Sequence, residues 1–379
     1  MALVVLLVIL GSASAAVGLS GALSGSKSNP NQANASLAVG PQLSVETTTP
    51  TTEPPLPGAG APGYFNSVTC ASVSLCITVG GGVADVGLID RSTNGAKSFS
   101  SVPVPKGTQR LSAVACSDAL HCVAVGIGTL LYTSDGGVGW SLTTPPVSQT
   151  LFLGASCASA LRCIAVGMRP RPAQPDGGVL LVSDNAGKTW TNSSYPNLTP
   201  GIGSVSCPSA TTCIAVGGTV LVSNDAGATW VNRAVPDGIQ PLSSISCSTA
   251  KTCVALGPDT EAQTNPSLSA IAIETTDAGA NFEHLSLPPG SGYAVSISCK
   301  ASTCNALGAD PTGKFPTVGF WSSDSGTNWS TSSPYPPASQ LRGLYCPSTS
   351  QCIAVGRSNA HAVAFVSTSL GPWTKAAMS

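Results

Sequence analysis

Fourteen cysteines in seven close pairs are the residues whose type and spacing permit the clearest chemistry in this 379-residue sequence. An even number at a regular spacing is typical of disulfide bonds formed in an oxidising compartment. A metal site is the alternative, but it needs clustered ligands, and the chain has only three histidines and no Cys-x-x-Cys. We therefore predict no metal or other cofactor, and seven disulfides: Cys70–Cys76, Cys116–Cys122, Cys157–Cys163, Cys207–Cys213, Cys247–Cys253, Cys299–Cys304 and Cys346–Cys352.

Carboxylates are the other residues that would do chemistry, because glycoside hydrolysis uses two opposed acidic side chains. Asp259 and Glu261 lie in a long polar segment between apolar runs and are weak candidates for such a pair. Asp85, Asp176 and Asp310 lie in similar segments and are more typical of solvated loop residues. The sequence has no Gly-x-x-x-x-Gly-Lys-Ser/Thr, no His-Glu-x-x-His and no Gly-x-Ser-x-Gly. We therefore expect a chain without catalytic activity.

A sevenfold repeat must position these residues. The first cysteines of the pairs stand 40–52 residues apart, and short apolar runs follow each pair. The runs are β-branched and bounded by Gly, Pro and Ser, which predicts strands rather than helices. A period of this length built from short strands is typical of a propeller blade. We predict repeats that start near residues 64, 110, 151, 201, 241, 293 and 341.

Each repeat divides into four strands. In the second repeat we expect them at residues 111–116, 122–125 and 129–133 and from residue 140. Four antiparallel strands make one blade, and the cysteines then flank a hairpin turn, within disulfide range of each other. The predicted fold is an all-β, seven-bladed β-propeller over residues 64–379 with one short-range disulfide per blade. Either residues 373–379 or residues before Phe65 complete the seventh blade.

The turn between the third and fourth strands carries the most specific pattern. Its most complete copy is Ser223-x-Asp225-x-Gly227-x-Thr229-Trp230, and the first and seventh copies are degenerate. An Asp or Asn side chain accepts N–H groups of such a turn, Gly supplies a positive φ, and the aromatic packs into the blade. We assign these roles to Asp135, Gly137, Trp140, Asn185, Gly187, Trp190, Asp225, Gly227, Trp230, Asp277, Gly279, Phe282, Asp324, Gly326 and Trp329.

This turn resembles the Asp box, or BNR repeat, of sialidase-type propellers, sortilin-like receptors and some xyloglucanases. The whole repeat, with Ala-Val-Gly before a short third strand and then the box, is most similar to propellers of the photosystem II assembly-factor type. The resemblance covers about residues 64–379. It implies the propeller fold and leaves the function open, because these families do different things on one scaffold. The paired cysteines depart from the photosystem-associated members.

A sialidase-like glycoside hydrolase is an alternative that this resemblance implies. Such enzymes have an arginine triad for a carboxylate, a tyrosine nucleophile with a glutamate partner, and an acidic aspartate. The Arg-Ile-Pro motif of the first arginine is absent, and the repeats hold only three glutamates. Arg110 and Arg342 lead into first strands and are expected at the channel mouth, with Tyr345 near Arg342. These residues make a poor catalytic set.

Loops on the face opposite the cysteine hairpins vary in length and are the expected binding surface. Binding residues prefer loops on a rigid scaffold, whereas uniform turns are structural. Tolerated insertion is the alternative explanation for the long loops of repeats 3, 5 and 6. The expected ligand-binding residues are Arg169, Arg171, Asp176, Asp259, Glu261, Asp310, Lys314 and Arg342.

The N-terminal segment indicates export. Residues 2–10 are a continuous apolar run, and Ala13-Ser14-Ala15 resembles a signal-peptidase site. No basic residue precedes the run, so a retained signal-anchor at residues 1–23 is the alternative to a cleaved signal peptide. Residues 24–63 are rich in Thr, Pro and Ser and predict a disordered linker. The chain is therefore expected outside the cytoplasm, either secreted or anchored to the cell membrane.

Charge excludes some classes of partner. The chain has 16 basic and 17 acidic side chains, and charged residues make up only 9% of it. Nucleic acids and anionic membranes require a basic surface, so we expect neither, apart from a possible N-terminal anchor. The predicted function is a monomeric, non-catalytic binding or scaffold module for a protein or glycan at the cell surface. An assembly factor for a membrane protein complex is a further alternative that rests on the resemblance alone.

Overall fold

The computed structural model describes residues 62–170, 177–197, 199–239, 241–257, 270–288, 291, 293–309, 318–331, 339–368 and 372–379. The predicted N-terminal segment and almost all of the predicted linker lie outside these residues. So do six predicted site residues: Arg171, Asp176, Asp259, Glu261, Asp310 and Lys314. In the part of the chain that is described, no helix has the length and apolar character needed to cross a bilayer.

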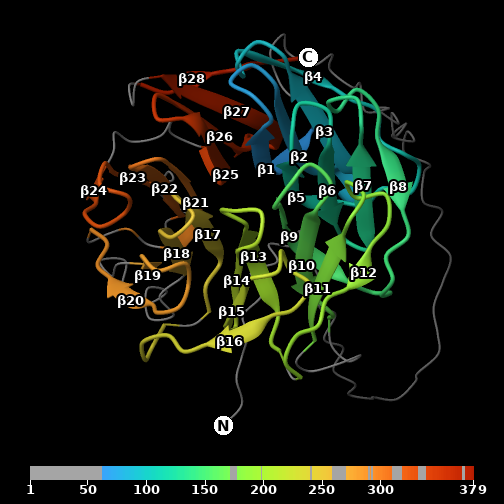
Figure 1. The fold of residues 1–379 in the computed structure, drawn as a ribbon. Helices are drawn as coiled ribbons and strands as arrows, with labels where there is room; N and C mark the ends of the chain where they lie inside the picture. Colours follow the sequence, from blue (N-terminus) through green and yellow to red (C-terminus); the bar gives the residue numbers. More distant parts are fainter. Residues whose placement is uncertain are drawn as a thin grey trace, which may run out of the picture. The chain divides into compact units, whose positions relative to one another are not determined.

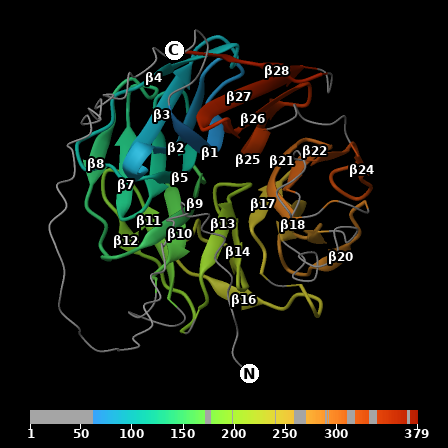
Figure 2. The same cartoon turned by 180° about the vertical axis from the view of Figure 1, so that it is seen from behind.

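Seven sheets, each built from four consecutive antiparallel strands, form seven blades (Figures 1 and 2). Within each blade the strands lie side by side in chain order. The first strand of each blade lies against the first strands of both neighbouring blades, and the first strand of the last blade lies against that of the first. The ring is therefore closed, and the prediction of an all-β, seven-bladed β-propeller is confirmed.

The strands of the first four blades have the following bounds. Blade 1 contains β1 (Gly63–Cys70), β2 (Cys76–Gly82), β3 (Gly87–Ser92) and β4 (Ser98–Ser101), with a short 3-10 turn, η1 (Val83–Asp85), between β2 and β3. Blade 2 contains β5 (Leu111–Cys116), β6 (Cys122–Gly126), β7 (Thr129–Thr133) and β8 (Ser141–Thr143). Blade 3 contains β9 (Leu151–Cys157), β10 (Cys163–Met168), β11 (Gly178–Ser183) and β12 (Thr191–Asn192). Blade 4 contains β13 (Ile202–Ser206), β14 (Cys213–Gly217), β15 (Val220–Ser223) and β16 (Val231–Arg233).

The remaining three blades follow the same plan. Blade 5 contains β17 (Ser244–Cys247), β18 (Cys253–Gly257), β19 (Ile271–Thr275) and β20 (Glu283–Leu285). Blade 6 contains β21 (Tyr293–Lys300), β22 (Thr303–Ala309), β23 (Val318–Ser322) and β24 (Ser330–Thr331). Blade 7 contains β25 (Ser339–Ser348), β26 (Gln351–Ser358), β27 (His361–Thr368) and β28 (Thr374–Lys375), and β29 (Ala377–Met378) follows.

The second strands of the blades are largely apolar because blades stack face to face. Strands β6, β14 and β18 are buried at every residue, and separate core clusters fill the seams between neighbouring blades. A strand covered on both faces needs no alternation of apolar and polar residues. The fourth strands are short and largely exposed, since they form the rim of the ring.

All seven predicted disulfides are present and join the first strand of each blade to the second. Their Cα atoms lie 3.9–4.1 Å apart, at the end of the hairpin where the two strands pair directly. A closed loop this short contributes about 2 kcal/mol to stability on the chain-entropy model. Each blade is thus cross-linked by its own disulfide.

The turn between the third and fourth strands is held by two side chains. In blade 4, Ser223 Oγ accepts the Gly227 N–H at 2.8 Å, and Asp225 Oδ1 accepts the Thr229 N–H at 2.9 Å. The Ala226 N–H donates to Thr211 O in the cysteine hairpin, so both turns lie at the same end of the blade. Gly227 has φ 84°, and a Cβ there would lie 2.7 Å from Ile164 Cγ1 of the preceding blade. Glycine is therefore required both by conformation and by space.

The equivalent acidic turns repeat this pattern. In blade 5 the Asn281 N–H donates to Asp277 Oδ1 at 2.9 Å, and in blade 6 the Asn328 N–H donates to Asp324 Oδ1 at the same distance. Hydrogen bonds to the charged form of a carboxyl favour that form. These backbone donors, with further side-chain donors, lower the pKa of Asp277 and of Asp324 to about 2.

Serine hydroxyls connect the first strands of neighbouring blades. Ser204 Oγ accepts the Ile245 N–H of the next blade at 3.3 Å, and Ser298 Oγ accepts the Cys346 N–H at 2.9 Å. The same bond recurs at five further sites, in which the accepting serines are Ser67, Ser156, Ser244, Ser246 and Ser296. These bonds explain the Ser-x-Ser-Cys pattern before several first cysteines and fix the register between blades.

The chain's own C-terminal residues complete blade 7, which was one of the two alternatives. Strand β28 pairs with β27, and β29 then adds to β4 of blade 1 as a fifth, parallel strand. The Ala377 N–H donates to Lys97 O at 3.0 Å. At the other end of the seam, the Gly63 N–H donates to Ala360 O of blade 7 at 2.9 Å. Residues from the N-terminal and the C-terminal end of the propeller therefore both form hydrogen bonds between blades 7 and 1.

The seam between blades 7 and 1 contains a buried carboxyl group, Asp90. It lies two residues before the turn serine, where the other blades have Leu131, Leu181, Leu221, Ile273, Phe320 and Phe365. Asp90 is only 2% exposed, and Ser101 Oγ donates to its Oδ1 at 2.9 Å. Burial raises the pKa of Asp90 to about 6, and the bond from Ser101 offsets only part of the effect. The charged form is therefore destabilised in the folded protein.

We expect Ser223→Ala to lower the free energy of unfolding by about 1–3 kcal/mol, because it leaves the buried Gly227 N–H without its acceptor. Asp225→Asn is the matched control and should change it little, since Asn185 holds the equivalent turn of blade 3. Urea unfolding of the oxidised protein gives both values. Equal losses in the two variants would contradict the role assigned to the serine hydroxyl.

We expect Asp90→Asn to raise the free energy of unfolding at neutral pH. A folded-state pKa of about 6, against an ordinary 3.8, means that the contribution of Asp90 to stability is fully present below pH 3.8 and lost as pH rises through 6. The difference between variant and parent should therefore shrink by about 2 kcal/mol between pH 7 and pH 4. Denaturant unfolding across this range measures it, and parallel pH profiles would show that Asp90 does not titrate in this way.

Candidate functional site

Bulges near the start of the first strands set the geometry of one end of the ring. Six first strands have one extra residue there: Asn66, Ser112, Leu153, Gly203, Val295 and Arg342. The residue before each extra one pairs with a glycine of the second strand, and this glycine permits the bulge, because a Cβ on Gly356 would lie 2.0 Å from Gln340 O. A bulge re-aims a side chain out of the alternation of the strand. In blades 1 and 7 the re-aimed side chains are Asn66 and Arg342, and Arg342 Nη1 donates to Asn66 Oδ1 at 3.2 Å.

Tyr64, on β1, is the centre of a cluster of polar side chains at this end. The guanidinium of Arg342, on β25, stacks over its ring with Cζ 4.5 Å from the ring centroid. Arg110, just before β5, donates from Nη1 to Tyr64 Oη at 3.3 Å. Tyr64 Oη in turn donates to Asp85 Oδ1 at 3.5 Å. We call Tyr64, Asp85, Arg110 and Arg342 the arginine–tyrosine cluster.

A strained loop presents Asp85 to this cluster. Ala84 and Asp85 both have left-handed backbone conformations, with φ 59° and 58°. Non-glycine residues adopt such conformations at a cost, and they are concentrated at functional sites. Asp85 lies 3.6 Å from Arg110 Nη1, and its side chain is 60% exposed. This ion pair is open to solvent, so an incoming ligand competes with it at little energetic cost.

The cluster is electropositive. Burial lowers the pKa of the Arg342 guanidinium, and the nearby charges of Arg357 and Arg110 lower it further, while Tyr64 acts in the opposite direction. In the residues that the structure describes, Asp85 is the one carboxylate ion-paired with any of these three arginines. A partly buried cation that is not neutralised favours an anionic ligand.

A neighbouring cleft extends the site along blade 7. It has a volume of about 350 Å³ and is lined by Gln340, Arg357, Asn359 and Ala360. Gln340 and Arg357 are paired across β25 and β26, and Arg357 Nε donates to Gln340 Oε1 at 2.7 Å. The guanidinium of Arg357 therefore borders both the cleft and the electropositive cluster.

The sequence predicted only part of this site. Arg342 and Arg110 lie at this end of the first strands, as expected. Tyr345 does not join them, because it is partly buried and packs against the core between blades 7 and 1, where it hydrogen-bonds Thr69. Arg169 follows β10 on blade 3, and no contact joins it to the cluster among the described residues.

Tyr64, Asn66, Gln340 and Arg357 were missed as site residues. A signal for Tyr64 and Gln340 existed in the repeat. Phe65, Leu111 and Leu341 pair with the equivalent glycines Gly80, Gly126 and Gly356 of their second strands. Tyr64, Arg110 and Gln340 therefore precede equivalent residues. Aligning the repeats at this position would have placed all three at one end of neighbouring blades.

The chemistry available here is recognition of an anion rather than metal binding. Arginine forks match the geometry of carboxylates and phosphates, and stacking on Tyr64 holds one fork in place. Within the described ranges, no group of three or more His, Cys, Asp or Glu side chains is placed to hold a metal ion. The acidic residues of the turns between third and fourth strands bond to those turns and lie with the cysteine hairpins, at the other end of the blades.

Comparison with known proteins identifies solved structures of similar fold. No protein-family model and no curated protein sequence matches the chain. Solved structures do match: an ancestral GH74 enzyme has a TM-score of 0.60 and 15% identity over 85% of this chain and 47% of its own. YCF48 from Cyanidioschyzon merolae has a TM-score of 0.58 and 14% identity over 83% and 97% of the two chains. YCF48 bound to D1 peptide has a TM-score of 0.51 and 15% identity over 70% and 80%.

This chain covers different shares of these two kinds of protein. This chain spans about half the length of the GH74 enzyme, whereas it covers almost all of the Cyanidioschyzon YCF48 chain. At these identities the similarity shows a shared seven-bladed fold and carries no residue of either protein across to this one.

Proposed function

We propose that this chain is a non-catalytic binding module that recognises a carboxylate-bearing segment of a protein partner at the arginine–tyrosine cluster. The observation that carries the proposal is the gathering of Arg110, Arg342 and Arg357 at one end of the ring, with Asp85 as their one ion-paired carboxylate among the described residues. A carboxylate of the partner replaces or supplements Asp85 and accepts paired N–H groups from an arginine fork. The adjoining cleft along blade 7 has room for the flanking peptide.

Two further observations support this proposal. One protein of similar fold, YCF48, is known in a complex with a peptide. We also interpret the Ser-x-Asp-x-Gly turns as Asp boxes, because their serine, acidic and glycine residues hold the turn in the same way in several blades. That interpretation is compatible with a propeller of the photosystem II assembly-factor type, and assembly of a membrane protein complex is one setting for such binding.

We propose that the protein acts outside the cytoplasm. Seven disulfides are typical of a protein of an oxidising compartment. The apolar residues 2–10 at the N-terminus fit export, by a cleaved signal peptide or a retained anchor, and residues 24–63 fit a linker that separates the propeller from a surface. A glycan is the alternative partner, and the protein is expected to act as a monomer.

One observation favours a second candidate function, a glycoside hydrolase of the sialidase-like superfamily. Tyr64 Oη lies within hydrogen-bonding distance of both a carboxylate and a guanidinium, an arrangement that suits a tyrosine nucleophile. Hydrolysis also needs a general acid for the leaving group. Asp85 is the one carboxylate bonded to Tyr64 in the described part of the chain, so it would have to serve two roles. We therefore rank this candidate second.

We expect an acetylated tripeptide with a free C-terminal carboxylate to bind the full-length oxidised protein more tightly than its C-terminal amide, by calorimetric titration. Affinity should fall as salt is added, because the contact is ionic and lies partly in solvent. An amide peptide with one internal Glu tests whether a side-chain carboxylate suffices. A screen of acidic and neutral glycans by the same method tests the alternative partner.

Arg342→Gln should weaken binding of the free-acid peptide about tenfold or more, as expected for loss of a charge-assisted hydrogen bond. Arg162→Gln is the control, because Arg162 pairs with Asp184 in the cysteine-hairpin region of blade 3 and should leave binding unchanged. Equal binding of acid and amide peptides, or equal effects of the two substitutions, would refute recognition of a carboxylate at the cluster.

Fluorogenic sialosides and other glycosides test the second candidate. We expect no turnover by the full-length protein. Turnover that Tyr64→Phe abolishes would overturn the non-catalytic proposal and make Tyr64 the nucleophile.

A further inference from the structure

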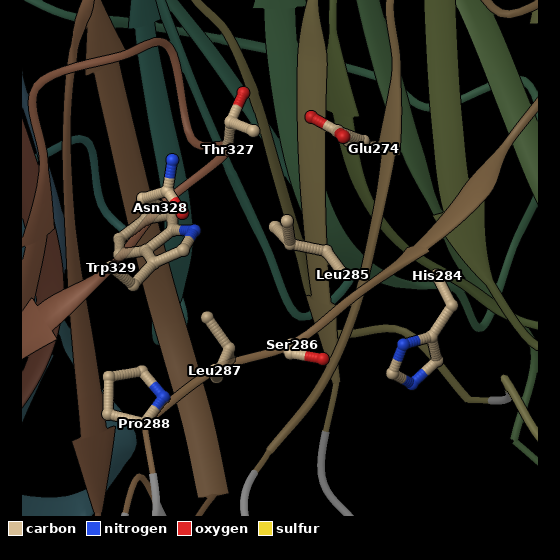
Figure 3. A pocket seen from close by; sticks show the side chains of 9 residues that line it. All are labelled: Glu274, His284, Leu285, Ser286, Leu287, Pro288, Thr327, Asn328 and Trp329. Atoms are coloured by element: carbon tan, nitrogen blue, oxygen red, sulfur yellow. The ribbon is translucent and has the colours of Figure 1, made fainter.

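The seam between blades 5 and 6 opens into a cleft on the flank of the ring. It has a volume of about 600 Å³ and is lined by Glu274, His284, Leu285, Ser286, Leu287, Pro288, Thr327, Asn328 and Trp329. Figure 3 shows Glu274 and Thr327 at one end of the cleft, Leu287 and Pro288 at the other, and Trp329 along one side. Leu285 lies between Trp329 and Glu274 in this view.

Glu274 departs from the repeat. It immediately precedes the turn residue Thr275, where the other blades have Arg91, Tyr132, Val182, Val222, Trp321 and Val366. At this position the side chain packs against the turn of the next blade, as shown by Val222 beside Gly279 and Tyr132 beside Gly187. Apolar side chains usually fill the seam here, so an acidic residue at this site is exceptional.

The only other charged residue at this position is satisfied within the protein, whereas Glu274 is not. Arg91 Nε donates to Gly136 O in the turn of blade 2 at 2.7 Å. Glu274 Oε2 is buried and has no hydrogen-bond partner in the described structure. A buried polar atom without a partner costs about 1–3 kcal/mol, and the carboxylate that carries this atom lines the cleft, which indicates a missing donor.

The acidic residues around Glu274 indicate that the missing donor is cationic. Glu283 pairs with Glu274 across β19 and β20, and Asp324 belongs to the facing turn of blade 6. Burial raises the pKa of Glu274, and the charges of Glu283 and Asp324 raise it further. None of the lining residues that the structure describes is Lys or Arg, and the alternation of β20 directs the His284 side chain to the face opposite Leu285. A cationic donor relieves this repulsion.

The walls of the cleft specify the shape of the donor. Leu285, Leu287, Pro288 and Trp329 make one side of the cleft apolar, which suits an alkyl chain behind a charged head. An indole also attracts a cation near its face. A metal ion fits less well, because no group of three or more His, Cys, Asp or Glu side chains in the described ranges is placed to hold one.

We infer that the cleft between blades 5 and 6 binds the side chain of a lysine or arginine from a partner polypeptide, with the cationic head on the Glu274 carboxylate and the alkyl stem along Trp329. This second site lies on different blades from the arginine–tyrosine cluster. The inference therefore does not depend on the proposed function, and each site is tested without the other.

The test uses the full-length oxidised protein and the peptides acetyl-Gly-Lys-Gly-amide, acetyl-Gly-Arg-Gly-amide and acetyl-Gly-norleucine-Gly-amide. Norleucine keeps the stem and removes the charge. Ligand-observed NMR titration should detect binding of the two cationic peptides and none of the norleucine peptide. Failure of both cationic peptides to bind up to their solubility limit, or equal binding of the norleucine peptide, would overturn the inference.

Glu274→Val supplies the side chain that blades 3, 4 and 7 use at this position, so it should fold normally and match or exceed the parent in Tm. It should weaken the lysine peptide about tenfold or more. Glu274→Gln, which keeps the shape, should do the same, whereas Glu283→Gln should weaken binding less because it removes only a nearby charge. A lower Tm in both Glu274 variants would show that the carboxylate is structural, and unchanged peptide affinity would show that it is not the contact.

Discussion

The structure depends on the hydrogen bonds that join each first strand to the next one around the ring. Serine hydroxyls of one blade accept backbone N–H groups of the following blade, so neighbouring sheets are held in register along their innermost edges. An apolar contact has no fixed direction and tolerates small shifts of one sheet along the other. A hydroxyl that must reach a specific N–H allows few such shifts. Bulges near the start of β1 and β25 then place Asn66 and Arg342 beside each other, 276 residues apart in the chain.

The two ends of the blades are built for different purposes. At one end, the disulfide hairpin and the serine–acid turn are hydrogen-bonded together in the same way in several blades, and glycine at the turn permits close contact with the preceding blade. This end has little freedom to vary. At the other end, loops differ between blades, and the arginine–tyrosine cluster draws on blades 1, 2 and 7. A rigid frame at one end allows side chains at the other to be held in place without a dedicated core.

The sequence predicted the frame because the frame repeats. Seven copies of a cysteine pair, an Ala-Val-Gly run and a turn gave independent evidence for the same strands, and the observed β5, β6 and β7 agree with the predicted strands to within one residue. The candidate site could not be predicted in this way. Tyr64, Arg110 and Arg342 are not repeated, and their proximity comes from ring closure, which brings residues of the first and last blades together. Loop length selected Asp259, Glu261 and Lys314 as candidates, and these residues lie outside the described residues. The segments that contain Tyr64 and Arg357 are short, so the same criterion did not select them.

Departures from the repeat are therefore the most informative residues in this protein. A repeat supplies its own controls, because six other blades show which side chain satisfies a given position. Asp90 and Glu274 replace residues that are mostly apolar, and burial raises the pKa of both. Their environments nevertheless differ: Ser101 donates to Asp90 within the same blade, whereas Glu274 Oε2 has no donor among the described residues. The first arrangement explains a polar residue inside a closing seam, and the second is a cost that the fold alone does not offset, which is why we assign it to binding.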